Sequence, residues 1–426
     1  MDKKIYNFGK GKSGVWLTER DIELLKLIFD HRILSLKELK YYAESLYSVK
    51  HTTLAKKFQR WREEKIVVDK KYGDRTVYYR LTKNGYYILV NEGEIVPGDT
   101  HYKELAAPVN QTDHYFGIRD VVVRTLVEVK KLNMEVFSYS PASMPYIEKG
   151  NESSSPLIVP DWILTNQFGF LNIEIDTGNE NLNAIEAKID KYVKYATDRP
   201  DENHHVLIVI MDNQDKFFRY QKEFGLDRSG RVANVKRAII GANAHVHSNL
   251  HFYVAPMNKA HHMACSILTG QSKLIDELRS SEIEAIQTLL IMNNNFNYEI
   301  EQLNANDFYL PEVSNDLYAD AHVLLKDGDS EKRKVVLIKL MEEGSCKCLD
   351  ELNYLNTLRM EKRFKQKVNK IIAIYRSTSE FEYDSLGKPI MQHVVFGVKE
   401  RLMSDIDSPP FYKNANQFKK GAGILL

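Results

Sequence analysis

The sequence predicts a mixed α/β (α+β) protein of three parts, in which a small helical domain with a β-hairpin precedes two domains built on mixed sheets. Three observations predict it. Residues 15–90 combine helical apolar spacing with a hairpin, a hairpin-helix-strand order follows, and a similar order recurs near the C-terminus. The chain of 426 residues is long enough for each part to bury its own core. We therefore expect domains over residues 1–95, 96–270 and 271–426.

The composition is that of an ordinary globular protein, with 43% hydrophobic and 27% charged residues. No run of about 18 apolar residues occurs, and the N-terminus lacks the apolar region of a signal peptide. The chain has 3 cysteines, an odd and small number that fits a reducing compartment. We expect a cytoplasmic protein with no membrane partner and no organic cofactor.

The charge is unevenly distributed along the chain. Residues 1–95 hold 20 Lys and Arg against 13 Asp and Glu, a net charge of +7, whereas the remainder carries −6. Residues 50–83 alone hold 11 basic and 4 acidic groups. A local basic field of this kind predicts that the N-terminal part contacts a polyanion.

Residues 15–64 are expected to form three helices. Thr18, with Asp21 three residues later, caps the first, and Ser35 begins the second. The third runs from about Lys50 to Glu64 and turns Leu54, Phe58 and Trp61 inward. Its outward face is polar and basic and has the size that enters a major groove. The residues of this face are Thr52, Thr53, Lys56, Lys57, Gln59, Arg60 and Arg62.

A hairpin with cations near its tip is expected directly after the third helix. Residues 66–69 and 77–81 are its strands, and Lys70, Lys71 and Arg75 flank the turn. Three helices followed by such a hairpin predict a winged helix-turn-helix. In that arrangement the hairpin grips phosphate while the third helix probes base edges, so the expected partner is double-stranded DNA.

A linker and a long helix precede the second part. Residues 91–111 contain several Gly and Pro residues and favour a linker, and residues 112–131 favour a helix with a mainly apolar face. His114 lies on this helix, where a histidine that is hydrogen-bonded to its neighbours is the more common case than a metal ligand.

Acidic residues gather on the hairpin that follows. Asp161 opens an apolar run, and residues 170–176 return as a second strand on which Glu174 and Asp176 share one face. We expect the other face of this strand to pack and Asp161 to lie close across the hairpin. Three converging carboxylates repel one another unless a cation lies among them, and oxygen ligands of this charge suit Mg²⁺ or Mn²⁺.

The next helix carries Lys188 and Tyr192 on one face, four residues apart. Asp161, the run Glu174-Ile175-Asp176 and Lys188 together resemble the PD-(D/E)xK nuclease core. In detail the stretch resembles the replication-relaxation family of plasmids and integrative elements, which joins a winged helix to such a core. The resemblance implies catalytic roles for Asp161, Glu174, Asp176, Lys188 and Tyr192. The lysine of the motif is expected at position 176, where this chain has Asp, so Lys188 would act from the helix.

A rival enzyme class rests on a histidine pair. His245 and His247 flank Val246, and a His-apolar-His triplet in a strand is how rolling-circle or conjugative relaxases hold their metal. Glycine and asparagine precede the triplet, which favours a loop, and no helix bearing a tyrosine follows closely. We therefore expect His245 and His247 to be two histidines of a loop and not metal ligands.

The C-terminal part repeats the order of the middle part. A second hairpin spans residues 319–341, followed by an expected helix over residues 352–368 and an apolar strand over 371–375. A shift of 165 positions places Lys339 on Glu174 and Met341 on Asp176. We therefore expect a degenerate second copy of the nuclease-like core that lacks the metal ligands. The expected helix also carries a cluster of cations, from Arg359 to Lys370, which is a candidate DNA surface.

These observations predict a sequence-specific DNA-binding protein of a plasmid or integrative element that acts in replication or relaxation complexes. A homodimer is expected, because winged-helix proteins commonly pair across palindromes, and a relaxase or replication initiator is the expected protein partner. One alternative is an active Mg²⁺-dependent DNA endonuclease. Another is a transcriptional regulator with a degenerate sensing domain.

Overall fold

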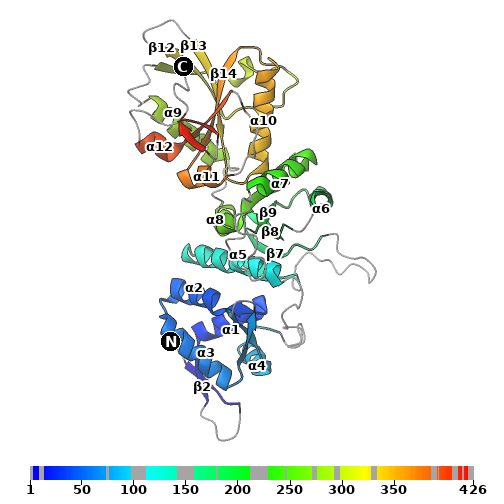
Figure 1. The fold of residues 1–426 in the computed structure, drawn as a ribbon, viewed down its shortest axis with the longest axis vertical. Coiled ribbons are helices and arrows are strands. Elements are labelled where there is room, and N and C mark those ends of the chain that lie inside the picture. The colour runs from blue at the N-terminus through cyan, green and yellow to red at the C-terminus, as the bar shows by residue number, and fades with distance from the viewer. Residues whose placement is uncertain are drawn as a thin grey trace. The chain divides into compact units, whose positions relative to one another are not determined.

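The computed structural model covers the whole chain (Figure 1). It describes residues 3–8, 14–72, 76–96, 112–141, 158–178, 181–211, 229–244, 247–270, 276–291, 298–327, 333–384, 391, 393–404, 411–414 and 417–420. The chain divides into two compact units. Unit 1 comprises Met1–Gln167, Asn172–Thr177 and Met211–Leu226, and unit 2 comprises Phe168–Leu171, Gly178–Ile210 and Asp227–Leu426.

Unit 1 begins with helices and two small sheets. The elements are β1 (Lys3–Tyr6), β2 (Val15–Thr18), α1 (Glu19–His31), β3 (Leu34–Ser35), α2 (Leu36–Tyr47), α3 (His51–Glu63), β4 (Val67–Tyr72), β5 (Thr76–Leu81) and α4 (Lys83–Asn91). Strands β1 and β2 pair antiparallel, and a three-stranded antiparallel sheet has the order β3-β5-β4. The three predicted helices and the predicted hairpin are confirmed.

The caps of these helices are local and follow from the sequence. The Asp21 carboxylate accepts hydrogen bonds from the backbone N–H and the hydroxyl of Thr18, at 2.9 and 2.8 Å. At α2, Ser35 Oγ accepts from the backbone N–H of Glu38, and the Glu38 carboxylate accepts from the backbone N–H of Ser35. Both pairs satisfy backbone donors that the first turn of a helix leaves without partners.

Unit 1 continues with α5 (Thr112–Lys131), β6 (Phe137–Tyr139), β7 (Trp162–Asn166) and part of β8 (Gly169–Asp176). Helix α5 packs closely, because a Cβ added at Gly117 would lie 3.2 Å from Met211 Sδ and 3.6 Å from a methyl carbon of Ile175. Ile175 therefore faces α5. Since side chains alternate along a strand, Glu174 and Asp176 point to the opposite face of β8.

Unit 2 begins with α6 (Leu182–Thr197), β9 (His204–Ile210), α7 (Ser229–Gly241), β10 (Leu250–Pro256) and α8 (Met257–Leu268). Strands β9 and β10 are parallel, with His205 opposite His251. The sheet to which they belong has the strand order β10-β9-β8-β7-β6. All seven residues of β9 are buried, as expected for a central strand.

The rest of unit 2 forms a seven-stranded sheet with the order β11-β12-β13-β14-β15-β16-β17. Its elements are α9 (Asp276–Ile291), β11 (Tyr298–Gln302), the 3₁₀ turns η3 (Ala305–Asp307) and η4 (Asn315–Leu317), β12 (Ala321–Asp327), β13 (Arg333–Leu340), α10 (Cys346–Met360), β14 (Val368–Tyr375), α11 (Thr378–Tyr383), β15 (Val394–Val398), α12 (Lys399–Ser404), β16 (Tyr412–Asn414) and β17 (Gln417–Lys420).

Helices cover both faces of this second sheet (Figure 1). Leu352 and Leu355 of α10 pack on one face, in a cluster with Leu337. Ile286 of α9 and Leu402 of α12 pack on the other face. The sheet is therefore the middle layer of three.

The first five strands of this sheet follow the plan of the other large sheet. In each sheet the first two strands are antiparallel (β6 with β7, β11 with β12), and the last two of the five are parallel (β9 with β10, β14 with β15). A helix precedes each set of strands, α5 in one case and α9 in the other. The strand orders β6 to β10 and β11 to β15 therefore correspond.

Several expectations need correction or lie outside the described residues. The helix expected over residues 352–368 is α10, which ends at Met360. Lys362 adopts a positive φ of 58°, and the N–H of Arg363 bonds to the carbonyl of Leu358 at 2.9 Å, a Schellman closure that stops the helix. Two residues of the His-apolar-His triplet at 245–247 lie outside the described residues. Within those that are described, no helix has the length and apolar character to cross a membrane.

Candidate functional site

The exposed face of α3 presents the residues that the sequence predicts as DNA contacts. Leu54, Phe58 and Trp61 are buried as predicted, and the Phe58 ring lies 4.8 Å from Trp61 and 4.6 Å from Tyr79 between centroids. This packing fixes which face of the helix is turned to solvent. The exposed residues among the candidates are Thr52, Thr53, Lys56, Gln59, Arg60 and Arg62, and Lys57 is half-buried.

Some of these candidates also bind within the protein. Lys57 forms an ion pair with the buried carboxylate of Asp21. Arg60 donates to the carbonyl of Gly14 at 3.1 Å, and Arg62 pairs with Asp69 at 3.1 Å. These contacts fix the position of the guanidinium groups, whereas Lys56 is exposed on the same face.

The hairpin β4-β5 follows α3 directly. Lys70 and Lys71 lie exposed on β4, opposite Tyr78 and Val77 of β5. Arg75, the third cation predicted for this hairpin, lies outside the described residues. The described part of the hairpin thus carries two exposed cations close in sequence to its turn.

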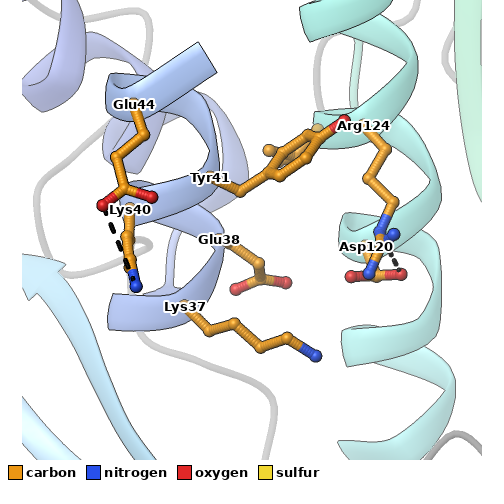
Figure 2. A pocket seen from close by; sticks show the side chains of 8 residues that line it. Lys37, Glu38, Lys40, Tyr41, Glu44, Asp120 and Arg124 are labelled. Atoms are coloured by element: carbon orange, nitrogen blue, oxygen red, sulfur yellow. Dashed lines mark ion pairs between the residues drawn. The ribbon is translucent and has the colours of Figure 1, made fainter. Parts of the chain in front are cut away.

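A small cavity between α2 and α5, of about 230 Å³, was not predicted from the sequence (Figure 2). Glu38 points into it, and burial raises the pKa of this carboxyl to about 7. The Tyr41 hydroxyl donates to Glu128 at 3.0 Å, and Arg124 pairs with Asp120 at 2.9 Å. A sequence offers little warning of such a site, since Glu38 there looks like an ordinary capping residue.

Buried polar groups join α1 to α5 within unit 1. The His31 carbonyl accepts from Arg119 Nε at 3.0 Å and from the Tyr115 hydroxyl at 2.8 Å. The His31 ring stacks on Trp162 at 4.7 Å between centroids. Burial, and then the nearby Arg119 charge, holds the pKa of His31 well below its usual value, so the ring is neutral. These contacts hold the N-terminal helices against α5.

Asp161 lies next to β8, as predicted. One oxygen of its carboxylate, Oδ2, accepts from the backbone N–H of Ile175 at 2.8 Å and lies 2.8 Å from His114 Nε2. His114 is therefore a helix residue that is hydrogen-bonded to its neighbour, the reading that the sequence favours. This pair of contacts anchors the start of β7 to both β8 and α5.

Glu174 and Asp176 are 3% and 2% exposed, so the face of β8 that carries these carboxylates is buried. All residues from Leu171 to Asp176 of β8 are buried, so both faces of this strand are covered. Alternation along a strand separates its two faces but does not tell that both are covered. Among the described residues there is no group of three or more His, Cys, Asp or Glu side chains that could hold a metal ion. The predicted Mg²⁺ or Mn²⁺ site at Asp161, Glu174 and Asp176 therefore stays a prediction.

Lys188 and Tyr192, the other two predicted catalytic residues, lie on α6 and belong to unit 2. Lys188 is half-buried. Tyr192 is 2% exposed, and its ring packs edge-on to Phe252 at 6.0 Å. The tyrosine therefore has a packing role in the core of unit 2.

The second sheet carries a buried ion network that the sequence does not predict as such. Lys339 of β13 is 1% exposed, and its ammonium lies 2.5 Å from Glu351 and 3.5 Å from Asp320. Arg279 of α9 lies 2.5 Å from Asp320 and 3.8 Å from Glu351. Burial acts to lower the pKa of Arg279, but Asp320 in particular outweighs it, so the pKa is raised. Two cations and two carboxylates thus neutralise one another.

Two residues of this network correspond to residues at the Asp161 site by the shift of 165 positions, whereas Asp320 lies six positions before the one that the shift assigns to Asp161. His114 maps to Arg279 and Glu174 to Lys339. The Asp320 carboxylate accepts from the backbone N–H of Leu340 at 2.6 Å, as Asp161 accepts from Ile175, and Ile175 maps to Leu340. Lys339, in the position of Glu174, therefore places a side-chain cation beside Asp320.

A second cavity, of about 400 Å³, lies at the N-terminal ends of β9 and β10 in unit 2. His205 and His251 stack on its wall at 5.1 Å between ring centroids. Burial lowers the pKa of His205 to about 3 and that of His251 to about 4, so both rings are neutral near pH 7. The sequence alone does not predict that these two histidines lie side by side, because that depends on the register of β9 against β10.

Residues 25–210 match the replication-relaxation family, the family that the sequence resembles. The match covers most of the N-terminal helices, α5 and the hairpin that bears Asp161. It suggests a role in the replication of plasmids or mobile elements. A comparison with curated proteins finds no significant match.

Proposed function

We propose that this chain, with its replication-relaxation region over residues 25–210, is a sequence-specific DNA-binding protein that acts in replication or relaxation complexes of a plasmid or integrative element. The observation that carries the proposal is the exposed face of α3, on a domain with the element order α1-β3-α2-α3-β4-β5. That order is the order of a winged helix, in which the third helix enters the major groove.

The face of α3 has the chemistry that this role needs. Lys56 supplies a charge for phosphate, and Gln59, Thr52 and Thr53 supply hydroxyl and amide groups that pair with base edges. Lys70 and Lys71 on β4 supply phosphate contacts from the hairpin. The α3 helix would thus select the sequence while the hairpin fixes the position on the duplex.

The test is a salt titration of duplex binding by the full chain. We expect Lys56→Ala to weaken binding to all duplexes and to reduce the slope of log affinity against log salt by about 0.9. Gln59→Ala is expected to relax base preference in selections from a random duplex pool, by about 1–3 kcal/mol at one position. Lys40→Ala is the control that removes the same charge from another helix, at a partly exposed lysine of α2 whose ammonium lies 3.8 Å from Glu44.

An affinity that stays flat between low and moderate salt would overturn the proposal. A loss of affinity in Lys40→Ala equal to that in Lys56→Ala would also count against it, because it would point to net charge alone. A transcriptional regulator shares this interface and differs in the cellular readout, promoter occupancy without a replication or transfer defect. The homodimer and a relaxase or initiator partner stay predictions, and analytical ultracentrifugation of the full chain checks the first.

The alternative of a metal-dependent endonuclease also stays a prediction. What supports it is the pair of buried carboxylates Glu174 and Asp176 on one strand, beside the anchored Asp161. Incubation of supercoiled plasmid with Mg²⁺ or Mn²⁺ tests it. Nicking that disappears in both Asp161→Ala and Glu174→Ala would support the enzyme, and an absence of nicking by the intact chain under all conditions would reject it.

A further inference from the structure

The turn between α10 and β14 carries an unusual density of positive charge. Over residues 359–370 there are six basic side chains and a single acidic one, Glu361. The basic residues are Arg359, Lys362, Arg363, Lys365, Lys367 and Lys370. Because α10 ends at Met360, most of these cations project from a turn of the chain and not from one helical face.

Half of these cations have partners within the protein. Arg359 donates to the carbonyl of Val368 at 3.2 Å, and Lys365 donates to the carbonyl of Asn306 at 2.9 Å. Arg363 lies 3.7 Å from Glu312 and from Glu361. These contacts hold the turn in one conformation.

The other three are not used in this way. Lys362 and Lys367 are exposed, and Lys370 is half-buried at the start of β14. Within the described part of the chain, these three lysines make no ion pair. They leave a positive charge of three that nothing in the described fold neutralises.

The corresponding turn of the other sheet shows that the fold does not require these cations. By the shift of 165 positions, residues 359–370 correspond to residues 194–205, which join α6 to β9. That turn holds two basic and three acidic side chains. The same connection is thus made with a net negative charge, so the cations at 359–370 call for a reason beyond folding.

The positive charge of this turn affects the pKa of a neighbouring histidine. His393 precedes β15, and its pKa is lowered by burial and then by the charges of Arg359 and Lys370. An anion placed near the turn would relieve this repulsion. Phosphate groups of a nucleic acid are anions of the right kind, since lysine binds phosphate as a point charge without demanding one geometry.

We infer that the turn at residues 361–367, through Lys362 and Lys367, and the neighbouring Lys370 of β14 bind the phosphate backbone of duplex DNA. The inference rests on the proposed function, because it gives the same DNA ligand a second contact on unit 2. Backbone contacts fix register and add affinity but read no bases. The turn therefore adds salt-dependent affinity, and α3 retains the sequence preference.

The test compares two triple variants of the full chain that remove equal charge. In Lys362→Ala/Lys367→Ala/Lys370→Ala, we expect the slope of log affinity against log salt to fall by about 2.7, about 0.9 for each phosphate contact. The base preference selected from a random duplex pool is expected to stay as in the unmodified chain. The control, Lys191→Ala/Lys194→Ala/Lys413→Ala, removes three exposed lysines elsewhere in unit 2 and is expected to change the slope far less.

An unchanged slope in the first triple variant, while Lys56→Ala still weakens binding, would overturn this inference and leave the proposed function in place. Equal effects of the two triple variants would overturn it as well, because net charge would then explain the result. A loss of slope in the first triple variant together with no effect of Lys56→Ala would support the turn and reject α3 as the DNA-reading helix. No duplex binding by the intact chain would reject both.

Discussion

Lys339 shows how one residue can change the character of a site while the backbone around it is kept. Its ammonium lies between Asp320 and Glu351, where the corresponding strand of the other sheet has the carboxylate of Glu174. A buried charge is tolerated when opposite charges neutralise it, and it is costly when they are removed.

The first prediction concerns the removal of this ammonium. Lys339→Met keeps the length of the side chain but leaves Asp320 and Glu351 with Arg279 as their only cation in the network. We expect the free energy of unfolding to fall by about 3 kcal/mol, as for other broken buried pairs. Urea denaturation of the full chain measures it. Lys191→Met, at an exposed position, is expected to stay within about 0.5 kcal/mol, and equal stability of the two variants would contradict the role of the network.

The second prediction concerns Glu38. Its pKa is about 7 in the folded protein, above the ordinary 4.5, mainly because of burial and in part because of Asp120. Between pH 4.5 and 7 the folded chain therefore binds more protons at this site than the unfolded chain, and stability decreases as the pH rises through this window. Below it both states are protonated, and above it both are ionised.

Glu38→Gln is expected to remove this contribution while its amide oxygen still accepts from the Ser35 N–H. The free energy of unfolding of the variant, measured by urea denaturation from pH 4 to pH 8, should fall less steeply over the window than that of the unmodified chain. The difference is roughly of the order of a few kcal/mol for a buried carboxyl. Glu44→Gln, an exposed glutamate on the same helix, serves as the control. Parallel pH profiles for all three proteins would contradict the prediction.

At the scale of elements, the sequence predicts which face of α3 is buried and the hairpin that follows it. It does not predict where α10 ends. The apolar spacing of Leu54, Phe58 and Trp61 leaves one helical face to bury, and the structure buries it. Residues 359–367 contain good helix formers without Gly or Pro, so they favour a continued helix. A Schellman closure with a lysine in the left-handed conformation leaves no signal in the sequence.

The third prediction concerns the cap of α2. Ser35→Ala removes the acceptor for the Glu38 N–H, and we expect a loss of about 1 kcal/mol in the free energy of unfolding of the N-terminal helices. Ser35→Thr keeps the hydroxyl and is expected to lose much less. Chemical denaturation followed by circular dichroism compares them. Equal losses in the two variants would show that packing at this buried position, and not the cap, governs the effect.

At the scale of the whole molecule, the shift of 165 positions is the most useful signal that the sequence holds. It predicts that Lys339 replaces Glu174, and the structure adds that Arg279 replaces His114 and that Asp320 binds its strand as Asp161 does. The ion network itself joins residues from α9, β12, β13 and α10, so only the folded topology could reveal it. The burial of Glu174 and Asp176 was likewise hidden, because alternation along a strand tells the two faces apart but not which of them a helix covers.

The fourth prediction concerns a buried pair in unit 2 that joins α7 to the C-terminal sheet. Lys236 and Asp384 are 148 positions apart, are 0% and 1% exposed at their side chains, and form an ion pair. Asp384 also accepts from the Tyr375 hydroxyl at 2.8 Å and from the Gly344 N–H at 3.2 Å. We expect Lys236→Met and Asp384→Asn each to cost about 3 kcal/mol.

The double variant is expected to lose less than the sum of the two single losses, with a coupling of about 1–3 kcal/mol, because each substitution alone leaves a buried charge without its partner. A double-mutant cycle by urea denaturation of the full chain measures the coupling. Strict additivity would show that the two residues act independently, and the pair would then not be what holds α7 in place.

Glu174 and Lys339 carry opposite charges at corresponding positions of the two hairpins. This difference also bears on which sheet each hairpin joins while the chain folds during synthesis. The hairpin with Glu174 leaves the ribosome before the hairpin with Lys339, and their similar plans invite each to dock in the sheet of the other. Such an exchange would leave the ammonium of Lys339 without Glu351 and would place the Glu174 carboxylate beside Glu351. Either mismatch in a buried site costs roughly the 3–5 kcal/mol of a broken pair. The opposite charges of Glu174 and Lys339 therefore disfavour an exchange of the two hairpins.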